Sequence, residues 1–275
     1  MDACEQFAVL MDRDDADIDL GRAALLFARV EYPSLDVDAY LCHFDAMAAD
    51  VASRLGGERR AGEVVGTVAA YLHAELGFRG NAGEYYDPRN SYLNEVLDRR
   101  LGIPISLALI YLEVGRRLGV PFEGVGMPGH FLVRHADPQS PLMVDPFAHG
   151  VVVGEEECRA RLRVLYGDGA ALTPPMLAAV GVRSILFRML TNLKGVYVQR
   201  EDFARAARTV GLLLAVEPAA VAEYRDRGLL RFRAGDLTAA RADLEHYLEL
   251  SPDAADADTI RGQLTLIDCL RVMRN

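Results

Sequence analysis

A spacing of 34 residues between two prolines, Pro218 and Pro252, constrains the last third of this chain more than any other feature. Aligning the chain on these prolines brings similar residues into register: Phe203 with Leu237, Ala206 with Ala240, Val210 with Leu244, and Leu213 with Tyr247. A small residue at each helix crossing and a proline after the second helix are typical of antiparallel helix pairs that repeat along the chain. We therefore expect this segment to be entirely helical.

A period of 34 residues is the tetratricopeptide pattern. The second repeat fits it at six positions: Gly228, Gly235, Leu237, Ala240, Leu244 and Pro252. The first repeat fits less well, because Lys194 and Glu201 stand at its glycine positions, and Arg231 stands where the pattern has an aromatic residue. We expect residues 182–275 to form this unit, with residues 259–273 as a capping helix.

The first 80 residues have helical periodicity. Apolar residues recur every three to four positions in segments 18–30, 36–55 and 64–76, so each segment predicts a helix with one apolar stripe. The run GNAGEYYDPRN that follows, at residues 80–90, has the composition of a loop.

The middle of the chain combines helices with strands. Ser91 is expected to cap a short helix that ends at Arg100, and Pro104 suits the first turn of a longer helix that ends at Gly119. Alternating residues then predict strands at 130–135, 142–144 and 151–153, arranged as a hairpin or meander with a turn over residues 137–141. A helix is predicted over residues 155–166, and Pro174-Pro175 predicts a domain boundary.

Composition excludes several classes of function. The net charge of −10 disfavours general binding to nucleic acid or to an anionic membrane. The four cysteines form no CxxC pair, which excludes a zinc finger or a disulfide scaffold, and His130 and His135 lie five residues apart on a predicted strand, where they cannot share a metal. The acidic N-terminus is not a signal peptide. We therefore expect a cytoplasmic protein without metal or cofactor.

Residues 90–147 hold the side chains with the richest chemistry. Gly102-Ile103-Pro104 begins a helix, His130 follows Gly129, and Asp145 ends a strand. Papain-like and transglutaminase-like thiol enzymes use this order: a thiolate at a helix N-terminus, then a histidine, then an aspartate. In them the histidine transfers protons and the aspartate holds its tautomer.

Three runs in this segment resemble the SirB-like family, in which a transglutaminase-like core precedes tetratricopeptide repeats: NSYLNEVLDRRLGIPISLALIYLEVGRRLGV, GMPGHFLVRH and VDPFAHG. Residues 182–256 resemble the C-terminal part of that family. The resemblance implies an α+β fold. Residues 1–175 would form a helical N-terminal region and a transglutaminase/papain-like core with a small antiparallel sheet, and residues 182–275 an all-α tetratricopeptide-like unit.

The resemblance matches His130 and Asp145 with catalytic residues but departs at the nucleophile. Active transglutaminase-like enzymes have Gly-x-Cys at the start of the central helix, whereas here Gly102-Ile103 precedes Pro104. None of Cys4, Cys42, Cys158 and Cys269 lies there. The resemblance therefore implies a non-catalytic or weakly catalytic scaffold that binds protein or peptide, partly through its repeat unit.

A second hypothesis stays open, that of a hydrolase or acyl transferase acting on amide or peptide bonds. Its nucleophile would be Ser106 or a water, with His130 as base and Asp145 beside it. Ser106 lies in the first helical turn, where a serine also serves as a local cap or lines the site. Cys42 and Cys158 are weaker alternatives, since free cysteines are most often buried. Four further residues are expected to line a ligand pocket, with core packing an equal alternative for the aromatic ones: Tyr92, Asn94, Gly129 and Phe147.

Overall fold

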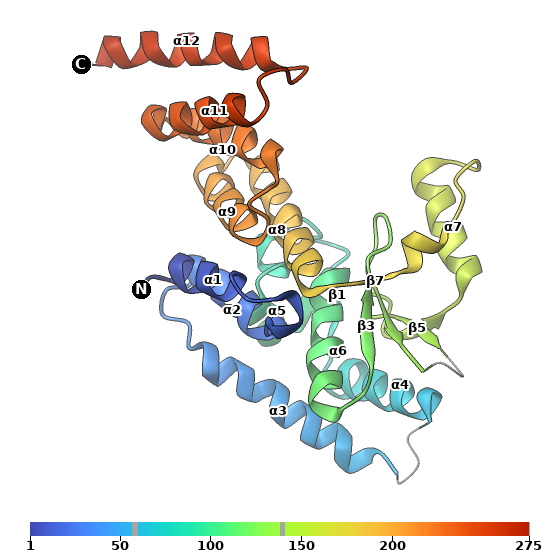
Figure 1. The fold of residues 1–275 in the computed structure, drawn as a ribbon. Coiled ribbons are helices and arrows are strands. Elements are labelled where there is room, and N and C mark those ends of the chain that lie inside the picture. Colours follow the sequence, from blue (N-terminus) through green and yellow to red (C-terminus); the bar gives the residue numbers. More distant parts are fainter. Residues whose placement is uncertain (57–59, 138–140, 275) are drawn as a thin grey trace. The chain divides into compact units, whose positions relative to one another are not determined.

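The computed structural model describes residues 1–56, 60–137 and 141–274, which form two compact units (Figure 1). One unit comprises residues 1–6 and 13–186, and the other comprises residues 7–12 and 187–275. The division falls inside helix α8 (Val182–Gln199). Pro174 and Pro175 belong to a short 3-10 turn, η4 (Pro174–Leu177), that precedes this helix.

The N-terminal part is helical over the predicted segments. It contains a short 3-10 turn, η1 (Asp15–Asp17), and four helices: α1 (Ala3–Met11), α2 (Leu20–Glu31), α3 (Val37–Arg54) and α4 (Ala61–Ala69). A π-helical segment, η2 (Ala70–Glu75), continues α4. The carboxylates of Asp19 and Asp36 accept the backbone N–H groups of Arg22 and Ala39, so both residues act as N-caps.

The central helix, α6 (Pro104–Leu118), starts at the predicted proline and ends at Gly119, whose φ is +67°. Before it come the 3-10 turn η3 (Pro88–Asn90) and helix α5 (Leu93–Arg99). The predicted cap by Ser91 is wrong, because Tyr92 occupies the N-cap position of α5, where its side chain makes no capping hydrogen bond to the helix. Two short strands, β1 (Arg79–Gly80) and β2 (Leu101–Gly102), pair in parallel just before α6.

Five antiparallel strands form the sheet, in the order β6-β5-β4-β3-β7. Their bounds are β3 (Phe122–Val125), β4 (Leu132–His135), β5 (Leu142–Asp145), β6 (Val151–Val153) and β7 (Ala179–Val180). The predicted meander is confirmed for β4, β5 and β6, although β4 begins two residues after His130. Strands β3 and β7 were not predicted. Residues 138–140 of the predicted turn lie outside the described residues.

Helices cover both faces of the sheet (Figure 1). Helix α6 packs on one face, where Gly115 leaves room for the Phe122 ring, since an added Cβ would lie 2.4 Å from the Phe122 Cδ2 atom. Helix α7 (Glu155–Tyr166) and residues 170–177 cover the other face. They close an apolar cluster of six buried residues: Val125, Met127, Leu132, Val153, Cys158 and Leu162.

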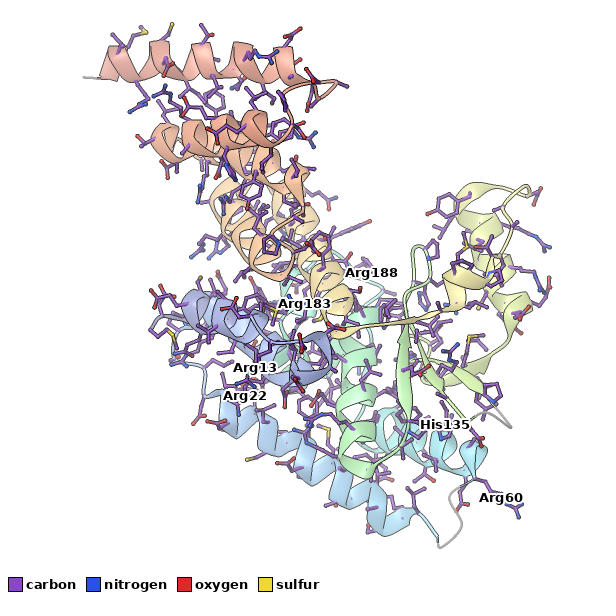
Figure 2. All side chains as sticks on the ribbon, in the orientation of Figure 1. Arg13, Arg22, Arg60, His135, Arg183 and Arg188 are labelled. Atoms are coloured by element: carbon purple, nitrogen blue, oxygen red, sulfur yellow. The ribbon has the colours of Figure 1, made fainter. Side chains whose placement is uncertain are left out.

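Glycine and aspartate fix the start of α8. The backbone N–H groups of Val182 and Arg183 donate to the Asp15 carboxylate, and the Arg183 guanidinium donates to the carbonyl of Arg13 at 2.7 Å (Figure 2). Gly181 allows this approach, because an added Cβ would lie 2.2 Å from Asp15 Oδ2.

The second unit confirms the predicted repeat. After α8 it contains α9 (Phe203–Val216), α10 (Val221–Arg233), α11 (Leu237–Leu250) and α12 (Ala257–Arg274). The paired small residues Ala206 and Ala240 are fully buried. Arg231, at the aromatic position of the pattern, binds Asp243 together with Arg227, so an ion cluster takes the place of a ring. No helix in the described part of the chain has both the length and the hydropathy that a membrane span needs.

Candidate functional site

His130 and Asp145 meet at one end of the sheet. The His130 Nε2 atom lies 2.9 Å from Asp145 Oδ1, and 14% of the His130 side chain is exposed. A turn before β4 presents this ring, since the His130 N–H donates to the carbonyl of Met127, and Gly129 adopts a φ of +69°. Because a carboxylate only accepts, the Nε2 atom carries the hydrogen.

Four donors surround the carboxylate of Asp145, which is fully buried. Besides His130, Oδ1 accepts the backbone N–H groups of Phe147 at 3.0 Å and Ala148 at 3.2 Å, and Oδ2 accepts the guanidinium of Arg161. Burial alone raises the pKa of Asp145, but hydrogen bonds and charge from His130 and Arg161 outweigh it and hold the pKa at about 2. Asp145 is therefore ionised and fixes the orientation of His130.

Helix α7 supplies Arg161, which the sequence reasoning missed. Cys158 and Leu162 are four residues apart on the inward face of α7, and Arg161, three residues after Cys158, lies at the edge of this face with 32% of its side chain exposed. Cys158 and Leu162 anchor this face in the apolar cluster. Leu165 lies against Gly129, where an added Cβ would come within 2.4 Å of its Cδ1 atom. The helical spacing around the apolar Leu162 was the signal that could have identified Arg161 as an inward-facing residue.

Aromatic rings form a wall beside His130. The Phe147 ring lies edge-to-face with the rings of His130 and Tyr85. The distances between ring centroids are 6.3 Å to His130 and 6.1 Å to Tyr85. Tyr85 contacts Tyr86 at 5.4 Å, and 60% of Tyr86 is exposed. Phe147 thus occupies the predicted position in the site, whereas Tyr85 and Tyr86 come from a loop in which only turn chemistry was recognised.

The start of α6 connects to this wall through glycines. Gly80 packs on Phe147, since an added Cβ would lie 2.5 Å from the ring, and it pairs with Gly102 in the β1–β2 ladder. Pro104, two residues later, is the first residue of α6 and is buried. The position that the family pattern gives to a thiol therefore holds a residue with no nucleophile and no N–H.

Ser106 acts as a helix cap. Its fully buried hydroxyl accepts the N–H of Ile103 at 3.0 Å and donates to the carbonyl of Asn90 at 2.7 Å, with the Ile103 carbonyl as a further partner at 3.1 Å. These partners are all backbone groups. The arrangement matches the capping alternative rather than a hydroxyl activated by His130.

Two predicted pocket residues lie on or beside α5. Tyr92 is 5% exposed and packs edge-to-face on Tyr32 at 5.4 Å and near Phe27 at 6.1 Å, which is the core-packing alternative. Asn94 is also 5% exposed, and its Oδ1 atom has no hydrogen-bond partner among the described residues. The structure groups His130, Asp145, Gly129 and Phe147, and it places Tyr92 and Asn94 on a different element.

The cysteines lie elsewhere. Cys158 is 1% exposed in the apolar cluster, and burial raises the pKa of its thiol, which disfavours the reactive thiolate. The other three, Cys4, Cys42 and Cys269, are exposed on α1, α3 and α12. His135 is buried on β4 with its ring against Phe122 (Figure 2). Within the described residues, no three side chains of His, Cys, Asp or Glu form a group able to hold a metal ion.

Comparison with known families agrees with this arrangement. Residues 38–191 match the model of the transglutaminase-like superfamily, and residues 193–265 match a tetratricopeptide repeat model. A UPF0162 protein of Xylella fastidiosa is 42% identical over 259 residues, covering 91% of this chain and 90% of that protein. A UPF0162 protein of Vibrio cholerae is 31% identical over 197 residues, covering 71% and 73%.

About half of the chain also resembles part of a larger eukaryotic protein. F-box only protein 21 of Mus musculus is 37% identical over 139 residues, which are 48% of this chain and 21% of that protein. No solved structure matches the chain. From the family models and the long alignments with UPF0162 proteins, the chain belongs to the transglutaminase-like superfamily, as a SirB-like protein whose core is followed by tetratricopeptide repeats.

Proposed function

We propose that this protein is a non-catalytic binding protein in which a transglutaminase-like site has become a recognition site. The observation that carries the proposal is Pro104 at the first position of α6, with the nearby Ser106 hydroxyl occupied by backbone groups. Neither residue supplies an activated nucleophile, whereas the His130–Asp145 pair stays fully assembled. The pair then serves to orient a polar ring beside the Phe147 ring.

The chemistry around His130 suits a peptide. An imidazole edge hydrogen bonds to amide groups, and the neighbouring Phe147 and Tyr85 rings offer apolar surfaces for side chains. Arg161 helps to keep Asp145 ionised, so the carboxylate holds the His130 ring in a fixed orientation for the ligand. The site would thus recognise a peptide or amide group without cleaving it.

The repeat unit supports the same class of function. Tetratricopeptide repeats generally mediate protein–protein interactions, and stacked helix pairs create concave surfaces that accept a helix or an extended segment. A protein with both parts would bring a peptide at the core and a protein partner at the repeats into one complex.

The test compares the native protein with His130→Ala. Peptide, amide and activated-ester libraries are incubated with both proteins, and products, covalent adducts and retained ligands are measured by mass spectrometry. We expect no turnover by the native protein, and a retained peptide that His130→Ala loses. Turnover that His130→Ala abolishes would show instead a hydrolase or acyl transferase with water as nucleophile.

A further inference from the structure

Strand β6 forms one end of the five-stranded sheet and consists of three valines. Val151 is 50% exposed and Val152 is 57% exposed. Natural edge strands usually carry lysine, proline or a bulge that prevents pairing with another chain, and residues 151–153 have no lysine or proline. The N–H of Val151 bonds to the carbonyl of Ala148, and within the described residues no strand pairs with the outer side of β6.

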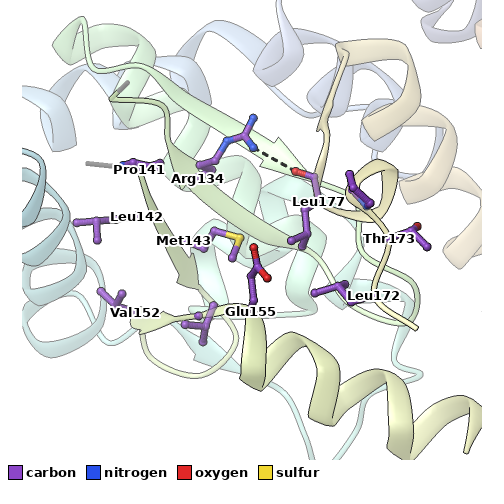
Figure 3. A pocket seen from close by; sticks show the side chains of 12 residues that line it. Arg134, Pro141, Leu142, Met143, Val152, Glu155, Leu172, Thr173 and Leu177 are labelled. Atoms are coloured by element: carbon purple, nitrogen blue, oxygen red, sulfur yellow. Dashed lines mark hydrogen bonds between the residues drawn. The ribbon is translucent and has the colours of Figure 1, made fainter. Parts of the chain in front are cut away.

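A groove of about 620 Å³ lies over β5 and β6 (Figure 3). Met143 of β5 and Arg134 of β4 lie along it, with Leu172 and Leu177 on the opposite side from Val152. Arg134 is already engaged, because its Nη1 atom donates to the Leu177 carbonyl at 3.1 Å and its Nε atom donates to Glu123 at 3.1 Å. The surface left for a ligand is mainly aliphatic.

One acidic group faces this aliphatic groove. Figure 3 shows the Glu155 carboxylate extending between Met143 and Leu172. Glu155 bonds to Arg159 at 2.6 Å, yet 60% of its side chain is exposed, so the carboxylate stays accessible. A ligand for this groove therefore needs apolar side chains together with positive charge.

We propose that β6 and this groove bind an extended segment of a partner protein with alternating apolar and basic residues, added to the sheet as a sixth strand. Its backbone would pair with the outer edge of β6, and an apolar side chain would pack toward Leu172. A lysine or arginine stem would lie on Met143 with its charge near Glu155. A net charge of −10 on each copy favours a basic partner over a second copy of this chain.

Neither His130 nor Phe147 nor any residue of the repeat unit lines this groove, although Val151 at the start of β6 pairs with Asp145. The probe is a fluorescein-labelled nine-residue peptide of alternating valine and lysine, and its control alternates valine and glutamate. Fluorescence anisotropy with the full chain measures the dissociation constants. We expect binding of the lysine peptide and much weaker binding of the glutamate peptide.

Two variants with matched controls locate the binding. Val152→Lys puts a charge on the edge, Glu155→Arg reverses the charge in the groove, and each should weaken binding of the lysine peptide about tenfold. Val164→Lys and Glu156→Arg make the same chemical changes at side chains that are 86% and 68% exposed and do not line the groove, so they should leave binding unchanged. Peptide binding should also slow amide hydrogen exchange at residues 151–153.

Four results would overturn the proposal. These are failure of the lysine peptide to bind, equal binding of the glutamate peptide, equal weakening by the control variants, or exchange protection in residues 203–274 instead of β6. Sedimentation velocity provides the remaining test. A dimer of the native protein that Val152→Lys dissociates would assign the edge to a second copy of the chain.

Discussion

Replacing Asp145 with asparagine tests whether one buried carboxylate organises the site. The amide of Asp145→Asn retains an oxygen that can accept from the N–H groups of Phe147 and Ala148 and from His130. It removes the negative charge, however, and turns an NH₂ group toward the Arg161 guanidinium. The substitution therefore preserves shape and most hydrogen bonds while breaking the ion pair.

The loss of stability follows from the pKa. The pKa of Asp145 is about 2 in the folded protein and 3.8 as a reference value, a shift that corresponds to about 2 kcal/mol at neutral pH. Breaking a buried ion pair costs roughly 3–5 kcal/mol when the remaining charge stays buried. Since 32% of the Arg161 side chain is exposed and can be hydrated, we expect a loss of about 2–3 kcal/mol.

The effect has a defined pH dependence. A carboxylate with a depressed folded pKa stabilises the protein fully above its unfolded pKa, and this contribution disappears as the pH falls toward the folded pKa. The difference in unfolding free energy between native protein and Asp145→Asn should therefore be constant above pH 5 and shrink between about pH 4 and pH 2.

Urea unfolding is monitored by hydrogen exchange in peptides that cover residues 142–150. It measures the difference in unfolding free energy within the unit that carries the site. Asp168→Asn, at an exposed position, is the control and should change stability by less than about 0.5 kcal/mol. A difference below about 0.5 kcal/mol for Asp145→Asn at pH 7, or one that stays constant down to pH 2.5, would refute the reasoning.

Three further perturbations test other parts of the molecule. Pro104→Cys places a thiol at the first position of α6, where the family pattern has its nucleophile. Its alkylation by iodoacetamide at pH 6.5 should be about tenfold faster than in the double variant with His130→Ala, and equal rates would show that His130 does not activate a thiol at this position. Ser106→Ala leaves the buried N–H of Ile103 without its acceptor, so the unfolding free energy measured in urea should fall by about 1–3 kcal/mol. Peptide binding at His130 should persist. Loss of binding at unchanged stability would contradict the capping role. Asp243→Asn removes the negative charge that Arg227 and Arg231 share. Hydrogen exchange in α10 and α11 should accelerate by about tenfold or more, whereas unchanged exchange would show that the ion cluster adds no stability.

Local patterns determined much of this protein from sequence alone. Helix ranges, the central helix beginning at Pro104, the three consecutive strands and the 34-residue repeat all come from periodicity and turn chemistry, which act between residues close in the chain. The absence of a thiol at the start of the central helix is likewise evident from one position, Pro104, which precedes His130 and Asp145 in a known order of residues. Such features need no knowledge of which elements touch.

Tertiary packing decided the rest. Strands β3 and β7 have four and two residues, and they exist because distant partners supply their hydrogen bonds. Ser91 did not become a cap, because the helix begins one residue later than its local signal suggests. The role of Arg161 depends on α7 folding back over the end of β5, sixteen residues after Asp145 in the chain.

The same distinction separates the candidate residues of the site. His130 and Asp145 could be paired in advance because their order in the chain follows a known pattern, and the capping role of Ser106 was one of two local alternatives. Choosing between those alternatives required the Asn90 carbonyl, which the loop brings to within 2.7 Å of the hydroxyl. Sequence determines which groups are available and how each segment folds locally. Long-range packing sets the partners of each buried polar group, because a buried donor or acceptor must find its partner wherever the fold provides one.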